Sequence, residues 1–309
     1  MEKSFSALTR SELAKTRLGK ERHLLAELAA FAFCSGTLKL GRGKVSLVLS
    51  SEAEDVILRA AAMIRKLYGR EPFIRAVEKR QPKKHTVYSF EISPDQPEGA
   101  LLFTIGLLTG SPDAIGFGDM DKRVFDQPGC FEAVLRGAFL GCGVLCDPHK
   151  GYRLEFVLSN GTFAAYLLDS MRENDIAAKA TERGEKQVLY IKQVEDINKV
   201  LILSGATGAM LETENVRTLK DVKNQLNRAD NCMIGNMGKT ISAAGRQTED
   251  IQTILTAGYP LTEPLKQACE LRLAHPDATL AELAEFGGTT KSALNKRFIK
   301  LREIRESLG

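Results

Sequence analysis

Apolar and polar residues follow the same order twice along the first two-thirds of the chain. In the first copy, an apolar segment that ends in glycine, residues 28–36, precedes an alternating run typical of strands, residues 37–50. A segment with helical spacing and two further strand-like segments follow. The second copy begins about 107 residues later, at 135–143, and keeps this order. Each copy therefore predicts a helix, two strands, a helix, two strands and a final helix.

The same pattern gives the expected bounds. In the first copy these are helix 28–36, strands within 37–50, a helix opened by residues 51–54 and ending near 68, strands 74–78 and 86–92, and helix 101–108. In the second copy they are helix 135–143, strands within 144–159, a helix ending near 173, strands 176–181 and 187–193, and helix 194–203. Ser51 and Glu54 form a capping-box pattern, and Asn160 is a suitable N-cap. One fixed offset indicates two copies of one structural unit.

Two segments outside these copies differ in character. Residues 111–129 are rich in Pro, Gly and Asp and predict a loop, and their aspartates lack the spacing of a calcium loop. After the breakers Gly205 and Gly208, apolar residues recur at near-heptad spacing from about Leu211. This predicts long connector helices interrupted around 229–231.

The end of the chain predicts three helices. Residues 262–274 form the first, and a capping box at Thr279 opens a short second helix. A glycine turn at 287–288 precedes a third helix that starts from Thr289. Its predicted apolar face contains Leu294, Phe298, Leu301, the stem of Arg305, and Leu308. A short helix, a glycine turn and a basic helix are typical of a helix-turn-helix, and three-helix packing without DNA is the alternative.

These elements predict an α+β fold of two αββαββα repeats, followed by an all-α helix-turn-helix domain. The expected domains are an N-terminal helical arm (1–20), the first repeat (21–110), a connecting loop (111–128), the second repeat (129–208), a helical connector (209–258) and the helix-turn-helix domain (259–309).

Composition narrows the function classes. A hydrophobic content of 43% in 309 residues suits a globular protein with a sizeable core. No run of 18 apolar residues occurs and the N-terminus is polar, so we expect a cytoplasmic protein with no membrane partner. The six cysteines show no CxxC spacing and no neighbouring histidine of ligand type, which predicts free thiols without zinc or disulfides.

The net charge of +4 is modest, but it is unevenly distributed. Residues 65–84 hold eight basic and two acidic side chains, whereas residues 172–192 of the second copy are nearly balanced. The first repeat would therefore present the more positive sheet to phosphates. The alternative is that these charges lie on a solvated hairpin tip and bind nothing. The possible DNA-binding residues of the first repeat, which we call the saddle candidates, are Lys39, Arg42, Lys44, Arg75, Lys79 and Arg80. Those of the connector are Asn227, Arg228, Asn231, Lys239 and Arg246. Polar contact between packed helices is the alternative for the connector residues.

The final helix supplies the main DNA-binding candidates. Residues 289–305 carry six basic side chains against one glutamate. Early residues of a recognition helix commonly reach base edges, and later basic residues commonly reach phosphates. The candidates are Thr289, Thr290, Lys291, Ser292, Asn295, Lys296, Arg297, Lys300 and Arg302.

The two glycine-ended segments resemble the signature helices of the LAGLIDADG homing endonucleases. In that family the two helices pack through small residues, and each carries a metal-binding acid before its final glycine. Those positions are Ser35 and Cys142 here. A hydroxyl and a neutral thiol lack the negative charge that a hard divalent cation requires. The resemblance implies that the two repeats form a saddle. It also implies that this DNA-binding scaffold has lost its catalytic acids, is not an enzyme, and uses no metal or cofactor.

The degenerate repeats, the connector around Asn227, Asn231 and Asn236, and residues 280–308 together resemble the WhiA family of bacterial regulators. This resemblance implies a sequence-specific DNA-binding regulator of transcription or chromosome organisation, linked to cell division or sporulation. It implies double-stranded DNA as partner at the nucleoid, with a second regulatory protein or RNA polymerase as a further candidate and no small-molecule substrate. The alternatives are a metal-dependent endonuclease that uses Asp147 or Asp169, and a protein-interaction scaffold that does not bind DNA.

Overall fold

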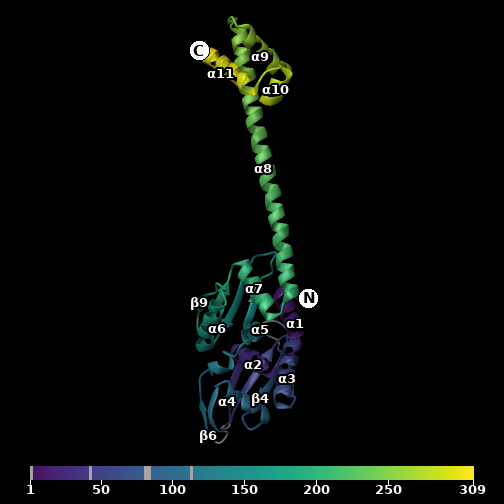
Figure 1. The fold of residues 1–309 in the computed structure, drawn as a ribbon, viewed down its shortest axis with the longest axis vertical. Coiled ribbons are helices and arrows are strands. Elements are labelled where there is room, and N and C mark those ends of the chain that lie inside the picture. Colours follow the sequence, from purple (N-terminus) through teal and green to yellow (C-terminus); the bar gives the residue numbers. More distant parts are fainter. Residues whose placement is uncertain (1–2, 42–43, 80–84, 112–113) are drawn as a thin grey trace. The chain divides into compact units, whose positions relative to one another are not determined.

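The computed structural model describes residues 3–41, 44–79, 85–111 and 114–309 (Figure 1). The chain divides into two compact units, Met1–Thr218 and Leu219–Gly309, each with its own hydrophobic core. Within the described residues, no helix combines the length and apolarity that a membrane crossing requires.

The first unit contains both repeats. It begins with α1 (Phe5–Ala14). The first repeat contains α2 (Glu21–Ser35), β1 (Gly36–Gly41), β2 (Lys44–Ser51), α3 (Glu54–Tyr68), β3 (Arg75–Lys79), β4 (His85–Ile92) and α4 (Ala100–Thr104). The second contains α5 (Phe131–Cys142), β7 (Gly143–Leu145), β8 (Leu154–Leu158), α6 (Gly161–Glu173), β9 (Lys179–Arg183), β10 (Lys186–Ile191) and α7 (Val194–Ser204). The α+β class and the predicted order of elements are confirmed.

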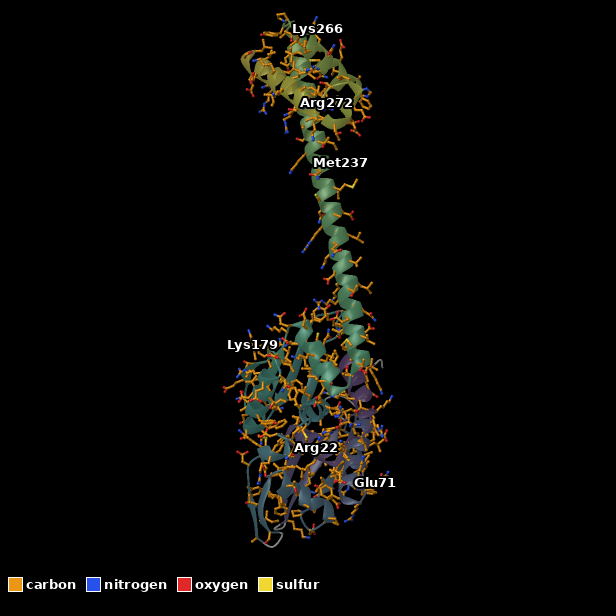
Figure 2. The ribbon with its side chains drawn as sticks, viewed as in Figure 1. Arg22, Glu71, Lys179, Met237, Lys266 and Arg272 are labelled. Atoms are coloured by element: carbon orange, nitrogen blue, oxygen red, sulfur yellow. The ribbon has the colours of Figure 1, made fainter. Side chains whose placement is uncertain are left out.

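Each repeat folds its four strands into one antiparallel sheet. The strand orders are β1-β2-β4-β3 and β7-β8-β10-β9. In the first sheet Leu47 lies opposite Ile92 and Leu49 opposite Phe90, so that all four side chains are buried on one face. The edge strand β9 exposes every residue, including Lys179 (Figure 2). The helices therefore cover one face of each sheet, as alternation predicts.

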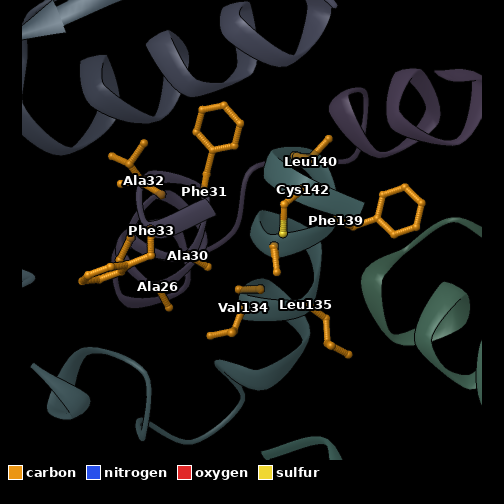
Figure 3. Close-up of a cluster of buried hydrophobic side chains, with 14 of the residues drawn as sticks. Ala26, Ala30, Phe31, Ala32, Phe33, Val134, Leu135, Phe139, Leu140 and Cys142 are labelled. Carbon is orange, nitrogen blue, oxygen red and sulfur yellow. The ribbon is translucent and has the colours of Figure 1, made fainter. Parts of the chain in front are cut away.

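Helices α2 and α5 pack against each other at the centre of the first unit (Figure 3). Glycines on α5 make this approach possible. A Cβ atom at Gly137 would lie 2.1 Å from the carbonyl oxygen of Glu27, and one at Gly141 would lie 2.5 Å from the Cβ of Cys34. No larger residue fits these two positions without moving a helix, as the small residues of both segments predicted.

The buried carboxylate of Glu27 joins the two repeats. It accepts from Arg59 of the first repeat at 2.5 and 3.0 Å, and from Nε of Arg136 of the second repeat at 3.0 Å. Backbone carbonyls accept the other guanidinium hydrogens, with Arg59 donating to Thr16 at 2.5 Å and Arg136 to Ser204 at 2.8 Å. Such partners are necessary because an unpaired buried charge is strongly destabilising.

The expected capping box at Ser51 is wrong. Ser51 remains in β2, paired with Tyr88, and its hydroxyl accepts from the backbone N–H of Ala53 at 3.1 Å. Helix α3 therefore begins at Glu54 without a side-chain cap. The cap at Asn160 is confirmed, since its side chain accepts from the N–H of Phe163 at 2.8 Å.

The segment after the first sheet also departs from expectation. The helix predicted over 101–108 ends at Thr104, because Gly106 takes a left-handed conformation with φ of 84°. Strand β5 (Leu108–Ser111) begins where the predicted helix was to end, and it pairs with β6 (Ala114–Phe117), which lies in the predicted loop with a 3-10 turn at Lys122–Val124. In the second repeat, β9 begins at Lys179 rather than at residue 176.

Helix α8 (Thr207–Thr256) is continuous, and the predicted interruption around 229–231 is wrong. The segment contains no proline, so its polar residues change the helix surface without breaking the backbone. Gly205 does end α7 in a left-handed conformation, but Gly208 lies inside α8. The second unit continues with α9 (Glu263–Ala274), α10 (Leu280–Phe286) and α11 (Lys291–Ser307).

Candidate nucleic-acid interface

Helix α10 begins with the predicted capping box. The N–H of Thr279 donates to the carboxylate of Glu282 at 2.7 Å, and the N–H of Glu282 donates to the hydroxyl of Thr279 at 3.3 Å. The hydrogen bond from the Thr279 backbone lowers the pKa of Glu282. This reciprocal pairing fixes the start of the first helix of the motif.

A tight turn joins α10 to α11. A Cβ atom at Gly287 would lie 2.6 Å from Cδ1 of Leu271, and Gly288 has a left-handed φ of 56°. Thr290, rather than Thr289, is the N-cap of α11, and its hydroxyl accepts from the N–H of Ala293 at 3.2 Å. Thr289 instead continues the turn, donating its N–H to the carbonyl of Ala284 at 2.9 Å.

The inner face of α11 consists of Leu294, Phe298, Leu301 and Ile304, which are buried with Leu283. The prediction placed Arg305 and Leu308 on this face in place of Ile304. Leu308 is 40% exposed, and the Arg305 side chain reaches outwards to Asp250 on α8 at 3.6 Å. The predicted apolar face was therefore shifted by one residue in the last turn of α11, where Ile304 is buried and Arg305 is not.

Arg272 organises the backbone before α10. Its side chain is almost fully buried, and its guanidinium lies over the Phe298 ring at 5.6 Å from the centroid. Nη1 donates to the carbonyls of His275, Pro276 and Ala278, and Nε donates to Gln247 on α8 at 3.0 Å. The planar fork of arginine suits this role because one group serves several acceptors at once.

The outer face of α11 lies opposite its buried face. It carries Ser292, Lys296, Ile299 and Glu303, all of which are exposed. Ile299 is 51% exposed in the middle of a polar and basic surface. An apolar side chain at this place can contact a thymine methyl group. Sequence reasoning placed Ile299 on this face without including it among the candidates, although its solvent-facing position was the available signal.

The basic residues of α11 fall into two groups. Within the described residues, Lys291, Lys296 and Arg297 form no ion pair. Lys300 pairs with Glu303 at 2.9 Å and Arg302 pairs with Glu306 at 3.1 Å. The uncompensated positive charge is therefore concentrated in the first two turns. Thr290, Lys291 and Ser292 are exposed there beside the N-cap, and Thr289 is half-buried.

Asn295 lies on the flank of α11 that faces α8. Together with Arg302 it lines a groove of about 350 Å³, to which α8 contributes Arg246 and Gln247. The guanidinium of Arg246 donates to the hydroxyl of Ser242 at 2.8 Å. Lys296 points away from the core, so the two candidates lie on different parts of the helix surface.

The connector candidates occupy the polar side of α8. Asn227, Arg228, Asn231 and Lys239 are all exposed. Asn227 and Asn231 are four residues apart and therefore share one side of the helix. Arg246 lies further along, at the groove described above.

Two of the described saddle candidates of the first sheet, Lys39 and Lys44, are paired with carboxylates. Lys39 lies 3.5 Å from Glu91, and Lys44 lies 3.5 Å from Asp95. A hydrogen bond from Ser46 is the main cause that lowers the pKa of Glu91, followed by the charge of Lys39. Arg75 and Lys79 are exposed on the edge strand β3. Arg42 and Arg80 lie outside the described residues.

The two lost acid positions do not suit a hard divalent cation. The hydroxyl of Ser35 donates to the carbonyl of Phe31 at 2.9 Å. The Cys142 thiol neighbours Cys34, and burial is the main cause that raises the pKa of Cys34. Arg10 donates to the carbonyl of Gly143 at 2.5 Å and places a positive charge beside this pair. The two positions therefore offer a hydroxyl and a thiol in place of carboxylates, with the guanidinium of Arg10 beside the thiol.

The carboxylates considered as alternatives lie elsewhere. Asp147 follows β7 and accepts from the N–H of His149 at 2.9 Å, and Asp169 on α6 pairs with Arg172 at 3.4 Å. Within the part of the chain that the structure describes, no group of three or more His, Cys, Asp or Glu side chains could hold a metal ion.

Comparison with known families gives three matches along the chain. Residues 21–108 match the WhiA N-terminal LAGLIDADG-like domain, residues 131–223 the WhiA LAGLIDADG-like domain, and residues 226–305 the WhiA C-terminal HTH domain. A probable cell division protein WhiA from Desulfitobacterium hafniense (strain Y51) is 37% identical, and the alignment covers 99% of this chain and 96% of the relative. The chain belongs to the WhiA family. A WhiA relative from Thermoanaerobacter sp. (strain X514) is 33% identical, over 99% and 98% of the two chains.

Solved WhiA structures share the fold. The crystal structure of full-length DUF199/WhiA from Thermotoga maritima aligns over 99% of both chains with a TM-score of 0.62 and 22% identity. An N-terminal LAGLIDADG domain of DUF199/WhiA aligns with a TM-score of 0.52 and 20% identity, over 66% of this chain and 92% of that domain. The predicted resemblance to WhiA is thus confirmed, and so is the combination of LAGLIDADG-like repeats with a helix-turn-helix.

Proposed function

We propose that this chain is a sequence-specific DNA-binding regulator of transcription or chromosome organisation, linked to cell division or sporulation. The observation that carries the proposal is the outer face of α11 on a helix-turn-helix core, where exposed Ile299 lies beside Lys296, which forms no ion pair among the described residues. Base edges are read by such short polar and apolar side chains, while basic side chains contact phosphates. The WhiA relatives named as probable cell division proteins support the biological setting.

Within α11, reading and positioning belong to different residues. Lys296, with Ser292 and Ile299 on the same outward face, reads base edges, and Asn295 on the neighbouring flank reads an adjacent base. Thr289, Thr290, Lys291 and Arg297 contact phosphates near the start of the helix. Lys300 and Arg302 lie further along and contact the backbone after exchanging their glutamate partners for phosphate. That exchange makes their contribution smaller than that of an unpaired lysine.

The saddle and connector have secondary roles in this proposal. Exposed Arg75 and Lys79, and the polar side of α8 with Asn227, Arg228, Asn231, Lys239 and Arg246, are available to phosphates. Lys39 and Lys44 contribute less because Glu91 and Asp95 already compensate them. Arg42 and Arg80 complete this set of candidates.

We further propose that the chain does not cleave DNA and is not an enzyme. Neutral donors at Ser35 and Cys142, with the guanidinium of Arg10 nearby, support this. The protein would act on double-stranded DNA in the nucleoid of the cytoplasm, with a second regulatory protein or RNA polymerase as an additional partner.

A binding titration at several salt concentrations tests the reading helix. The substitutions Asn295→Ala and Lys296→Ala should each cost about 1–3 kcal/mol on a selected site and little on random duplex. The substitutions Lys300→Ala and Arg302→Ala should weaken both duplexes equally and lower the salt slope by about one each. Lys266→Ala on α9 is the matched control and should change neither. An unchanged ratio of specific to random binding in Lys296→Ala would refute this docking of α11.

A plasmid assay separates the regulator from the endonuclease. Supercoiled DNA with magnesium or manganese should remain intact, and calorimetry with either ion should show no tight site. Divalent-ion-dependent nicking that disappears in Asp147→Asn or Asp169→Asn would establish the nuclease instead. A chain that neither binds nor cuts DNA would be the interaction scaffold.

A further inference from the structure

An apolar stripe runs along the part of α8 that belongs to the second unit. Its residues follow one another at intervals of three or four, which places them on one side of the helix. They are Leu219, Val222, Leu226, Ala229, Met233, Met237 and Ile241. We call this set the α8 stripe.

The large side chains of the α8 stripe are unpartnered. Leu219 is 68% exposed and Met233 is 70% exposed, and Met237 projects away from the ribbon (Figure 2). Val216 before the stripe and Ala244 after it are buried by the first and the second unit respectively. A continuous exposed apolar surface of this kind marks an interaction site in a soluble domain.

The other side of the same segment is poor in helix-forming residues. Gly235, Gly238 and Gly245 have open space where a Cβ atom would lie, so no contact in the described chain requires glycine there. Each glycine destabilises the helix relative to alanine. A helix with this composition depends on packing of its apolar side to remain ordered.

We propose that the α8 stripe pairs with the same stripe of a second copy of this chain, and that the two helices run antiparallel. The argument for a second copy is charge complementarity. Lys223 and Asp230 lie on one flank of the stripe, seven residues and therefore two turns apart. Within the described residues, neither side chain forms an ion pair. This inference does not depend on the proposed DNA binding.

The two charges match only in one arrangement. In an antiparallel pair with its two-fold axis between residues 226 and 227, Lys223 of each copy faces Asp230 of the other, and the two Leu226 side chains meet at the axis. A two-fold axis generates both ion pairs from one contact. In a parallel pair in register, Lys223 would lie at the same height as Lys223 of the other copy, and Asp230 at the same height as Asp230. Neither ion pair would then form.

Sedimentation velocity of the full-length chain over a concentration series is the first test. The wild type should form a dimer. Leu226→Gln, at the axis, should raise the dissociation constant about tenfold or more, because it places an amide in the apolar contact. Asn224→Gln, on the opposite side of α8, is the matched control and should change it by no more than about twofold. A wild type that remains monomeric throughout would refute the proposal.

Charge reversal tests the orientation without relying on a disruptive substitution. Asp230→Lys alone should weaken the dimer by placing two lysines opposite each other at both contacts. Combining Asp230→Lys with Lys223→Asp restores opposite charges and should recover the wild-type dissociation constant. A double variant as weak as the single variant would overturn the antiparallel arrangement.

The exposed thiol of Cys232 gives an independent measurement. In the proposed arrangement the two Cys232 residues are separated by about 16 Å along the axis, which is beyond the reach of a disulfide. Mild oxidation of the dimer should therefore produce no Cys232 cross-link. A cross-link formed in good yield would contradict this antiparallel register and overturn the proposal.

Discussion

Substituting Gly137 by alanine should destabilise the first unit through one atom. The new Cβ would lie 2.1 Å from the carbonyl oxygen of Glu27, whereas Cβ contacts under 3.0 Å are essentially never found. Helices α2 and α5 must therefore separate locally by about 1 Å. Overpacking of this kind costs about 1–3 kcal/mol. We expect the upper part of that range, because the displaced backbone carries Glu27, and its movement would disturb the hydrogen bonds of the Glu27 carboxylate with Arg59 and Arg136.

Hydrogen exchange of peptides from α2 and α5 measures this cost separately from the second unit. Calorimetry should show a melting temperature lower by about 2–4 °C for each kcal/mol lost, for a unit of this size. Gly235→Ala is the matched control, since its Cβ meets open space and the substitution should raise helix stability instead. If Gly137→Ala left the protection of both helices within about 0.5 kcal/mol of the wild type, the close approach would be wrong.

Three further predictions concern other parts of the fold. Glu27→Gln should cost the first unit about 3–5 kcal/mol in urea denaturation, because it leaves two buried guanidiniums without a counter-charge. Arg272→Met should lower the melting temperature of the second unit more than Arg302→Met does, because Met cannot donate to the carbonyls before α10. The lowered pKa of Glu282 implies stability that is present above its ordinary value of 4.5 and lost as the pH falls through the folded value. Glu282→Gln should therefore flatten the dependence of unfolding on pH in this acidic range, and an unchanged profile would contradict the capping contribution.

The repeated helices and strands could be predicted because their periodicity records which face is buried. Hairpin β5–β6 was missed, since its strands have four residues each, each strand contains a glycine, and the segment 111–129 as a whole has the Gly, Pro and Asp content typical of loops. The continuity of α8 was missed for a related reason, because the polar residues 229–231 imitate a break in a helix that lacks proline. Local composition alone does not show whether a polar segment interrupts a helix or only makes its surface more polar.

The candidate interface shows a similar limit. The order of its helices followed from the capping box and the glycine turn. Pairing of charges did not follow, because counting lysines and arginines does not show which of them has a carboxylate partner. The sequence does not distinguish Lys39 and Lys300 from Lys296. In the structure, Lys39 and Lys300 each pair with a glutamate, whereas Lys296 forms no ion pair with the described residues.

The shared carboxylate of Glu27 bears on how the two repeats fold. One arginine comes from each repeat, so a chain ending after the first repeat would lack Arg136 and would expose the surface of α2 that α5 covers. Either half alone therefore has an incomplete core and a charge cluster missing one member. We therefore expect the two copies visible in the sequence to fold as one cooperative unit, with neither copy stable until the other has been synthesised.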